Sequence, residues 1–146
     1  MQNAWSPERS ESLCLAGSCY EALKEPGQAI QCYSRAFSID GTRREPLLKL
    51  ATLSCKQSDF RGGVEYASAA LEIPRTSTYF EFDVNYSYVP HAILYWSLFW
   101  LGRKQQARRH WELCVQLAPN NPQFREHAKL FDPERKTNPK RLKADP

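Results

Sequence analysis

The amino-acid sequence predicts an all-α protein built from pairs of helices that stack on one another. Small and apolar residues recur after 34 residues and again after a further 44, which is typical of a repeated helix pair. Glycine, proline and aspartate stand between the amphipathic segments, where antiparallel helices need short turns. The chain has 146 residues, 42% of them hydrophobic, which suits one domain or a short array of repeats.

The first helix pair is expected at residues 7–24 and 27–40. Ser6 can cap the first of these helices with Pro7 in its first turn, and Pro26-Gly27 is expected to form the turn between them. The contact positions follow the spacing of one helix face and are Leu13, Ala16, Gly17, Tyr20, Ala29, Tyr33 and Ala36.

The second pair is expected at residues 44–57 and 60–73. Thr42-Arg43-Arg44-Glu45 has the pattern of a capping box, and Ser58-Asp59 falls between the two helices. Its contact positions repeat those of the first pair 34 residues later and are Leu47, Leu50, Ala51, Ser54, Gly63, Ala67 and Ala70.

The third pair, expected at residues 90–101 and 104–117, follows an aromatic-rich insertion at about 74–89. Gly102-Arg103 marks its turn. Alternation between Tyr79 and Val84 is weakly strand-like, but a lone strand has no partner in an all-helical array, so we expect a packed loop. The contact positions are His91, Leu94, Tyr95, Leu98, Ala107, Trp111, Cys114 and Pro119.

A seventh helix is expected at residues 122–131, opened by Asn121-Pro122. An array of helix pairs leaves the apolar side of its last pair exposed, so this helix is expected to act as a cap. The folded domain would then span residues 1–131. Residues 132–146, rich in proline, lysine and arginine, are expected to be a disordered basic tail.

These copies resemble the tetratricopeptide repeat (TPR), a helix-turn-helix unit of 34 residues. The expected repeats are residues 10–43, 44–77 and 88–121, and the first copy is the best match. Ser54 replaces the aromatic residue in the second copy, and Tyr95 stands at the small position in the third. The resemblance implies a right-handed solenoid of three helix pairs plus a capping helix, with a concave groove formed by the first helix of each pair.

Binding residues follow from this register. Carried over from TPR domains, the groove would show Glu11, Cys14, Leu15, Ser18, Glu45, Leu48, Lys49, Thr52, Lys56, Ala92, Ile93, Trp96, Phe99 and Trp100. Within this set, the residues expected to contact a ligand are Glu45, Lys49, Thr52, Lys56, Trp96, Phe99 and Trp100. Trp96 and Trp100, four residues apart, would stack as an apolar platform for an extended peptide or a sugar ring. Packing of the insertion over the tryptophans and simple solvation of the lysines are the alternatives.

Some TPR grooves hold the terminal carboxylate of a chaperone peptide with a set of lysine, asparagine and arginine side chains. Here Cys14 and Ser18 stand where such a clamp needs a cation and an amide. Binding of a chaperone tail is therefore not expected.

The sequence contains no signature of catalysis. The three histidines, His91, His110 and His127, lie on separate predicted helices without the spacing or flanking carboxylates of a metal site, and no glycine-rich phosphate loop is present. We therefore expect a protein that is not an enzyme and has no cofactor or metal.

Composition also limits the cellular setting and the partners. Five cysteines at irregular spacing are expected to be reduced and mostly buried, which favours the cytoplasm. No apolar stretch is long enough to span a membrane, and the N-terminus lacks the pattern of an export signal. Much of the net charge of +4 lies in the tail, so the folded part is close to neutral and nucleic-acid binding is not expected.

A narrower resemblance leaves two functions open. Arg43-Arg44-Glu45-Pro46-Leu47-Leu48, the insertion, and Tyr95-Trp96-x4-Leu101-Gly102-Arg103 resemble the repeat region that follows the catalytic domain in some bacterial family-2 glycosyltransferases. The paired aspartates Asp-x-Asp that hold metal and sugar nucleotide in those enzymes are missing from this chain. The chain is expected to be either a scaffold that binds a protein or peptide segment, or an accessory domain that assists glycosyl transfer by recruiting acceptor or partner.

Overall fold

The computed structural model describes residues 5–75 and 82–131, and within these ranges the regular structure is entirely helical. Each of the first six helices begins and ends within two residues of its predicted position, which confirms the all-α fold class. The elements are α1 (Ser6–Ala22), α2 (Pro26–Ile39), α3 (Glu45–Lys56), α4 (Phe60–Leu71), the short 3-10 helix η1 (Asp83–Tyr86), α5 (Val89–Trp100), α6 (Lys104–Leu117), α7 (Pro122–Glu126) and α8 (Ala128–Phe131).

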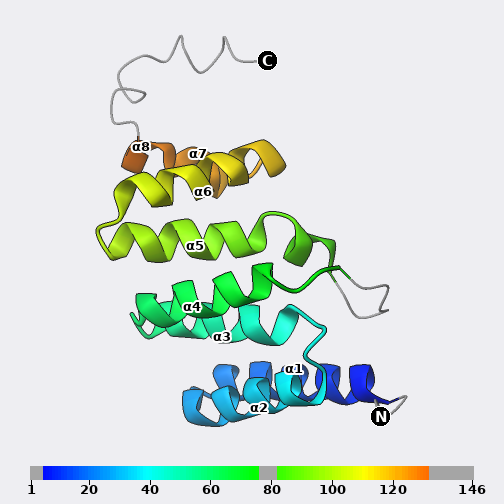
Figure 1. Ribbon diagram of the computed structural model, residues 1–146. Coiled ribbons are helices and arrows are strands. Elements are labelled where there is room, and N and C mark those ends of the chain that lie inside the picture. Colours follow the sequence, from blue (N-terminus) through cyan, green and yellow to red (C-terminus); the bar gives the residue numbers. More distant parts are fainter. Residues whose placement is uncertain (1–4, 76–81, 132–146) are drawn as a thin grey trace.

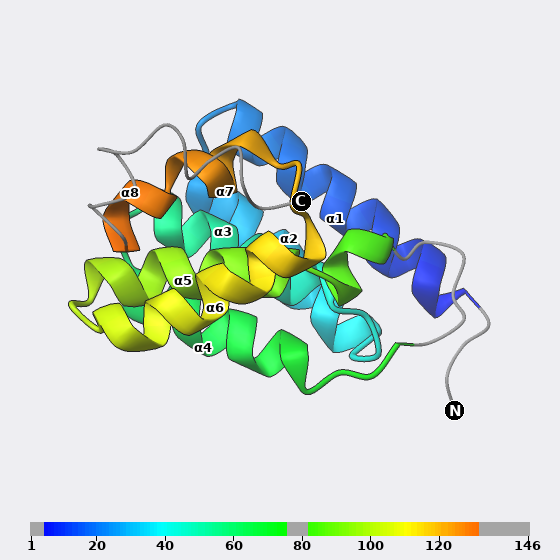
Figure 2. The same ribbon diagram turned by 90° about the horizontal axis from the view of Figure 1, so that it is seen from above.

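The helices pack as three antiparallel pairs that stack in chain order. Helix α1 packs against α2, α3 against α4, and α5 against α6, while α2 contacts α3 and α4 contacts α5 between the pairs. Helices α1 and α8 consequently lie at opposite ends of the stack (Figure 1). Seen from above, α1 runs obliquely to α5 and α6, so successive pairs are rotated along the stack (Figure 2).

The turns within the three pairs have the same geometry. Lys24, Ser58 and Gly102 each have a positive φ, of 59°, 61° and 79°, and they are separated by the predicted 34 and 44 residues. Each is followed by a residue whose N–H donates to the carbonyl five residues back, as in a Schellman motif. These bonds are Glu25 to Tyr20 at 2.9 Å, Asp59 to Ser54 at 2.8 Å and Arg103 to Leu98 at 2.9 Å. The turns lie along one edge of the stack, on the left in Figure 1.

The first of these turns corrects one prediction. Pro26-Gly27 does not form the turn, because Pro26 is the first residue of α2 and fits there since the N–H that proline lacks has no partner in a first turn. The reversal is made at Lys24 instead.

Small residues allow the paired helices to approach closely at the predicted contact points. A Cβ atom at Gly17 of α1 would lie 2.8 Å from two ring atoms of Tyr33 in α2. At Gly63 of α4, it would lie 2.5 Å from Oγ of Ser97 and 2.8 Å from Sγ of Cys55. Glycine is therefore required for contact within the first pair and between the second pair and α5.

Two of the predicted helix caps are wrong. Ser6 is the first helical residue and not the cap, since Trp5 precedes the helix without a side-chain capping bond. The capping box before α3 does not form, because Thr42 Oγ1 donates to Asp40 at 2.5 Å and Glu45 contacts Arg43.

Side-chain caps are present at two other helices. Asp59 accepts a bond from the N–H of Gly62 at the start of α4, and the predicted start at Asn121 is confirmed by a bond from the N–H of Gln123. Both side chains satisfy N–H groups that the first helical turn leaves unpaired.

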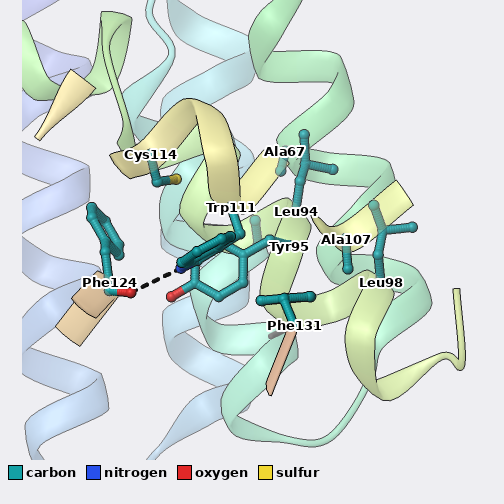
Figure 3. Close-up of a cluster of buried hydrophobic side chains, with 10 residues drawn as sticks. Ala67, Leu94, Tyr95, Leu98, Ala107, Trp111, Cys114, Phe124 and Phe131 are labelled. Atoms are coloured by element: carbon teal, nitrogen blue, oxygen red, sulfur yellow. Dashed lines mark hydrogen bonds between the residues drawn. The ribbon is translucent and has the colours of Figure 1, made fainter. Parts of the chain in front are cut away.

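The C-terminal cap covers the last helix pair, although the predicted seventh helix is divided at His127 into α7 and α8. Trp111 of α6 donates from Nε1 to the carbonyl oxygen of Phe124 at 2.9 Å, and its ring stacks on Phe131 with centroids 5.3 Å apart. Figure 3 shows Phe124 and Phe131 enclosing Trp111 together with Tyr95. The apolar side of the third pair is thereby shielded from water.

The described end of the insertion is fixed to the second pair by Arg44. Its guanidinium donates to the carbonyl oxygens of Ile73 at 2.7 Å, Asn85 at 3.1 Å and Leu71 at 3.2 Å, and lies 4.4 Å above the ring of Tyr86. Residues 85–88 are therefore packed, as expected for the loop, whereas residues 82–84 are exposed. The predictions for residues 76–81 of the insertion and for the tail at 132–146 lie outside the described residues.

All five cysteines are free, as expected, but fewer are buried than predicted. Cys14 and Cys114 are buried, Cys32 and Cys55 are half-buried, and Cys19 is exposed on α1. None of the helices in the described ranges is both long enough and apolar enough to cross a membrane.

Candidate ligand-binding groove

The first helices of the three pairs, α1, α3 and α5, form one face of the stack, and two cavities lie on it. Cavity A, about 600 Å³, lies between α1 and α3 and is lined by Ser18, Glu21, Ala22, Lys24, Pro26, Lys49, Leu53, Lys56 and Gln57. Cavity B, about 310 Å³, lies between α3 and α5 with one residue from α7, and is lined by Thr52, Cys55, Ala92, Ile93, Tyr95, Trp96 and Gln123.

Helix α3 connects the two cavities. Lys49, Thr52 and Lys56 follow the i, i+3, i+7 spacing of one helix face, so they lie in a row along the helix. The two lysines line cavity A, and Thr52 lines cavity B. We call the continuous surface over both cavities the groove.

A chain of polar side chains crosses cavity A. Lys49 Nζ donates to Ser18 Oγ at 3.2 Å, Ser18 Oγ lies 3.3 Å from the hydroxyl of Tyr33, and that hydroxyl donates to Glu21 at 2.6 Å. Lys56 Nζ donates to the second oxygen of Glu21 at 2.7 Å. Tyr33 reaches this chain from α2 because Gly17 leaves room for its ring.

Two of the three lysines that line cavity A, Lys24 and Lys49, have no carboxylate partner among the described residues. Partial burial acts to raise the pKa of Glu21, but hydrogen bonds from Lys56 and Tyr33 outweigh it and hold that pKa below its usual value. Glu21 is therefore ionised at neutral pH and neutralises Lys56. In the part of the chain that the structure describes, the only hydrogen-bond partner of Lys49 is the Ser18 hydroxyl. The ammonium of Lys49 can accept an anionic group.

Cavity B is bordered by aromatic rings. Trp96 lies parallel to His127 with centroids 5.2 Å apart, and it meets Trp100 edge to face at 5.8 Å and 74°. The predicted stacking of the two indoles is thus wrong. Trp100 stacks on Phe60 of α4 at 5.9 Å and is 55% exposed. Among the described residues, the cap and not the insertion covers part of Trp96.

Glu45 lies in neither cavity. Its carboxylate and that of Glu11 both accept from Nη2 of Arg43 at 2.5 Å, while Nη1 of Arg43 donates to Ser10 Oγ at 3.0 Å. The Arg43 side chain is fully buried between the first and second pairs. Burial, followed by a hydrogen bond with Glu11 and then the charge of Glu11, raises the pKa of Glu45 to about 7, against the opposing effect of Arg43. Glu45 therefore joins two repeats and is not displayed to a ligand.

The structure brings together four of the seven predicted site residues at the cavities: Lys49, Thr52, Lys56 and Trp96. Trp100 contacts Trp96 edge to face but lines neither cavity. Phe99 points into the contact with Phe131 and Trp100 and lines neither cavity.

The other residues expected in the groove divide between surface and core. Ser18, Ala92 and Ile93 line the cavities, while Cys14 and Leu48 are buried and Leu15 is 60% exposed outside both.

Two polar contacts of histidines were not predicted. Tyr95 hydroxyl and His127 Nδ1 lie 2.7 Å apart, and the Nδ1 atoms of His91 and His110 lie 3.0 Å apart across the third pair. His91 and His110 occupy the register positions of Leu13 and Cys32 in the first pair. The described residues contain no group of three or more histidine, cysteine, aspartate or glutamate side chains that could hold a metal ion.

The described chain is a helical-repeat protein with paired helices and a groove on the face of the first helices. Its fold is that of a TPR domain. Residues 10–43, the first predicted repeat, match the family model for the tetratricopeptide repeat. Comparison with curated proteins finds no match.

Comparison with solved structures agrees with this fold. The first TPR of Spaghetti (RPAP3), bound to the HSP90 peptide SRMEEVD, superposes with a TM-score of 0.74 at 16% sequence identity, covering 88% of this chain and 96% of that domain. The predicted TPR-like fold is thereby confirmed.

Proposed function

We propose that this chain is a non-catalytic binding module whose groove holds an extended, acidic peptide segment of a partner protein. The observation that carries the proposal is the position of Lys49, a cation without a carboxylate partner in the described residues, one helical turn from the aromatic cavity B. An acidic side chain at Lys49 and an apolar side chain at Trp96 would use both cavities at once.

The dimensions of the groove favour a peptide over a compact ligand. The two cavities adjoin along α3, and Lys49 and Lys56 are separated by seven residues, or about 10 Å along a helix with a rise of 1.5 Å per residue. Both lysines line cavity A, and an extended chain covers about 3.3 Å per residue, so about three residues of a peptide would span this cavity along α3. The peptide bound to the similar TPR domain agrees with this type of ligand, although that relationship extends only to the fold.

The side chains at the positions of a chaperone-tail clamp help to define which peptide can bind. Cys14 is buried beside the ion pairs of Arg43, and Ser18 is engaged by Tyr33 and Lys49. Neither offers a free cation or amide. We therefore propose that the preferred segment is acidic but differs from the peptide SRMEEVD of the similar complex.

Selection from a displayed library of random peptides tests this function. Enriched sequences should contain Asp or Glu close to an aromatic or large aliphatic residue, and a labelled enriched peptide should bind in fluorescence anisotropy. Lys49→Gln should weaken binding about tenfold, as expected for loss of a charge-assisted hydrogen bond.

Arg108→Gln is a matched control, because Arg108 is exposed on α6 and pairs with Glu112 at 3.0 Å, away from the groove. It should bind the peptide as the parent protein does. Enrichment of basic or featureless peptides, or equal loss of binding in both variants, would contradict the proposal.

The likeness to the repeat region of family-2 glycosyltransferases gives a second candidate, an accessory domain that recruits acceptor or partner. One observation favours it: Arg44, from the motif that carries the likeness, binds the described end of the insertion through Ile73 and Asn85. Two of the three parts of the likeness are therefore in contact in the structure. Sequencing the complete reading frame tests this candidate, which requires a catalytic domain with Asp-x-Asp in the same protein.

A further inference from the structure

A third cavity lies behind α5, separate from the groove. It measures about 350 Å³, lies between α4 and α6, and is lined by Val64, Ser68, Leu94, Leu98, Arg103, Gln106, Arg109 and His110. Helix α5 separates it from cavity B, since Ala92, Ile93 and Trp96 face that cavity whereas Leu94 and Leu98 face this one. We call it the back pocket.

One wall of the back pocket carries unbalanced positive charge. Arg103 and Arg109 both line it, and no carboxylate in residues 5–75 or 82–131 lies within 4 Å of either guanidinium. Arg108, the next residue on α6, differs because Glu112 neutralises it. Guanidinium groups match the geometry of phosphate and carboxylate oxygens with two parallel hydrogen bonds.

The rest of the lining combines an apolar floor with neutral polar groups. Leu94 and Leu98 form the floor with Val64, while Ser68 and Gln106 offer hydrogen bonds at the rim. Burial, followed by the neighbouring charge of His91, lowers the pKa of His110, so this ring adds no charge at neutral pH. A ligand that fits must therefore carry its charge at one end and an apolar body at the other.

We propose that the back pocket binds a small organic phosphate, with the phosphate held by Arg103 and Arg109 and its apolar body resting on Val64, Leu94 and Leu98. The volume is at the lower limit of small-molecule sites, which suits a ligand the size of an aryl phosphate. This site is independent of the groove and of the peptide that the groove is proposed to bind.

Phenyl phosphate is the probe, because it carries both halves of the expected ligand, and inorganic phosphate is its comparison. Titration followed by two-dimensional NMR should give saturable shifts at Val64, Leu94 and Gln106. Phenyl phosphate should bind about tenfold more tightly than inorganic phosphate, because burying its ring adds apolar contact. Arg103→Gln and Arg109→Gln should each weaken its binding about tenfold.

Arg108→Gln, one residue away and already paired, should change the affinity less than about twofold, the size of a surface charge effect. All three arginines are exposed, so circular dichroism should show each variant folded. The proposal is overturned by equal affinities for phenyl phosphate and inorganic phosphate or by equal weakening in all three variants. It is also overturned by shifts centred on Trp96 or by an absence of saturable binding.

Discussion

Replacement of Gly17 by alanine tests the close contact on which the first helix pair depends. In a solvent-exposed helix this change would stabilise the protein by about 1 kcal/mol, because alanine has the higher helix propensity. Here the new methyl group would lie 2.8 Å from Cδ1 and Cζ of Tyr33, whereas ordinary contact begins at 3.4 Å. Tyr33 is fully buried and cannot swing away, and its hydroxyl is held by Glu21.

Overpacking of this kind costs about 1–3 kcal/mol, and any shift of the ring also strains the bond to Glu21. We expect Gly17→Ala to lower the free energy of unfolding by about 1–3 kcal/mol in urea denaturation, despite its better propensity. Gly27→Ala in α2 is the matched control, because no described atom lies within 4 Å of the added Cβ. A Gly17→Ala protein as stable as the parent would refute the reasoning about Tyr33.

Two further changes test the cap and the buried ion pairs. A chain ending before Asn121 should unfold at lower urea concentration, because Trp111 loses its contacts with the cap residue Phe131. A chain ending at Asp132 should unfold at the same urea concentration as the parent. Equal unfolding midpoints for the two truncated chains would contradict the capping role. The pKa of Glu45 in the folded protein, about 7, is above its ordinary value of 4.5, so folding takes up a proton and the free energy of unfolding should fall as pH rises from about 4.5 to 7. Glu45→Gln should remove much of this fall in urea titrations at pH 5, 6 and 7.5. An unchanged dependence of stability on pH would contradict the raised pKa of Glu45.

Sequence periodicity was sufficient for the fold because every repeat satisfies the same local constraints. The register placed Gly102 and Ser58 in turns and both Gly17 and Tyr33 at helix contacts, since such contacts recur at fixed positions, and the structure shows that these two residues meet. The register failed at Lys24, where a lysine adopts the left-handed conformation that glycine or asparagine usually signals. The neighbouring Pro26-Gly27 offered a stronger but misleading turn signal.

The candidate site was predicted less well because its side chains contact residues that are distant in the sequence. Thr42–Glu45 has the local pattern of a capping box, yet Glu45 turns to Arg43, which also binds Glu11, 32 residues earlier. Periodicity reports which face a residue occupies and not which partner it finds there. Glu11 and Glu45 do share a register position, so two acids facing one arginine could have been noticed.

Trp96 and Trp100 were predicted to act together in binding. The structure shows that they differ in burial, so their replacement by alanine should affect folding differently. Trp96 is half-buried and lies against His127, so Trp96→Ala removes part of the contact with the cap and should destabilise the fold as well as weaken binding. Trp100 is 55% exposed, and its replacement removes ring contacts with Phe60, Trp96 and Phe99, each worth about 1 kcal/mol or less. Trp100→Ala should therefore stay folded by circular dichroism, while its affinity for an enriched acidic peptide falls about tenfold in anisotropy, since exposed tryptophans concentrate interface energy. If Trp100→Ala binds that peptide as tightly as the parent protein, the aromatic part of the groove ends at Trp96 and the peptide does not reach the turn edge of the stack.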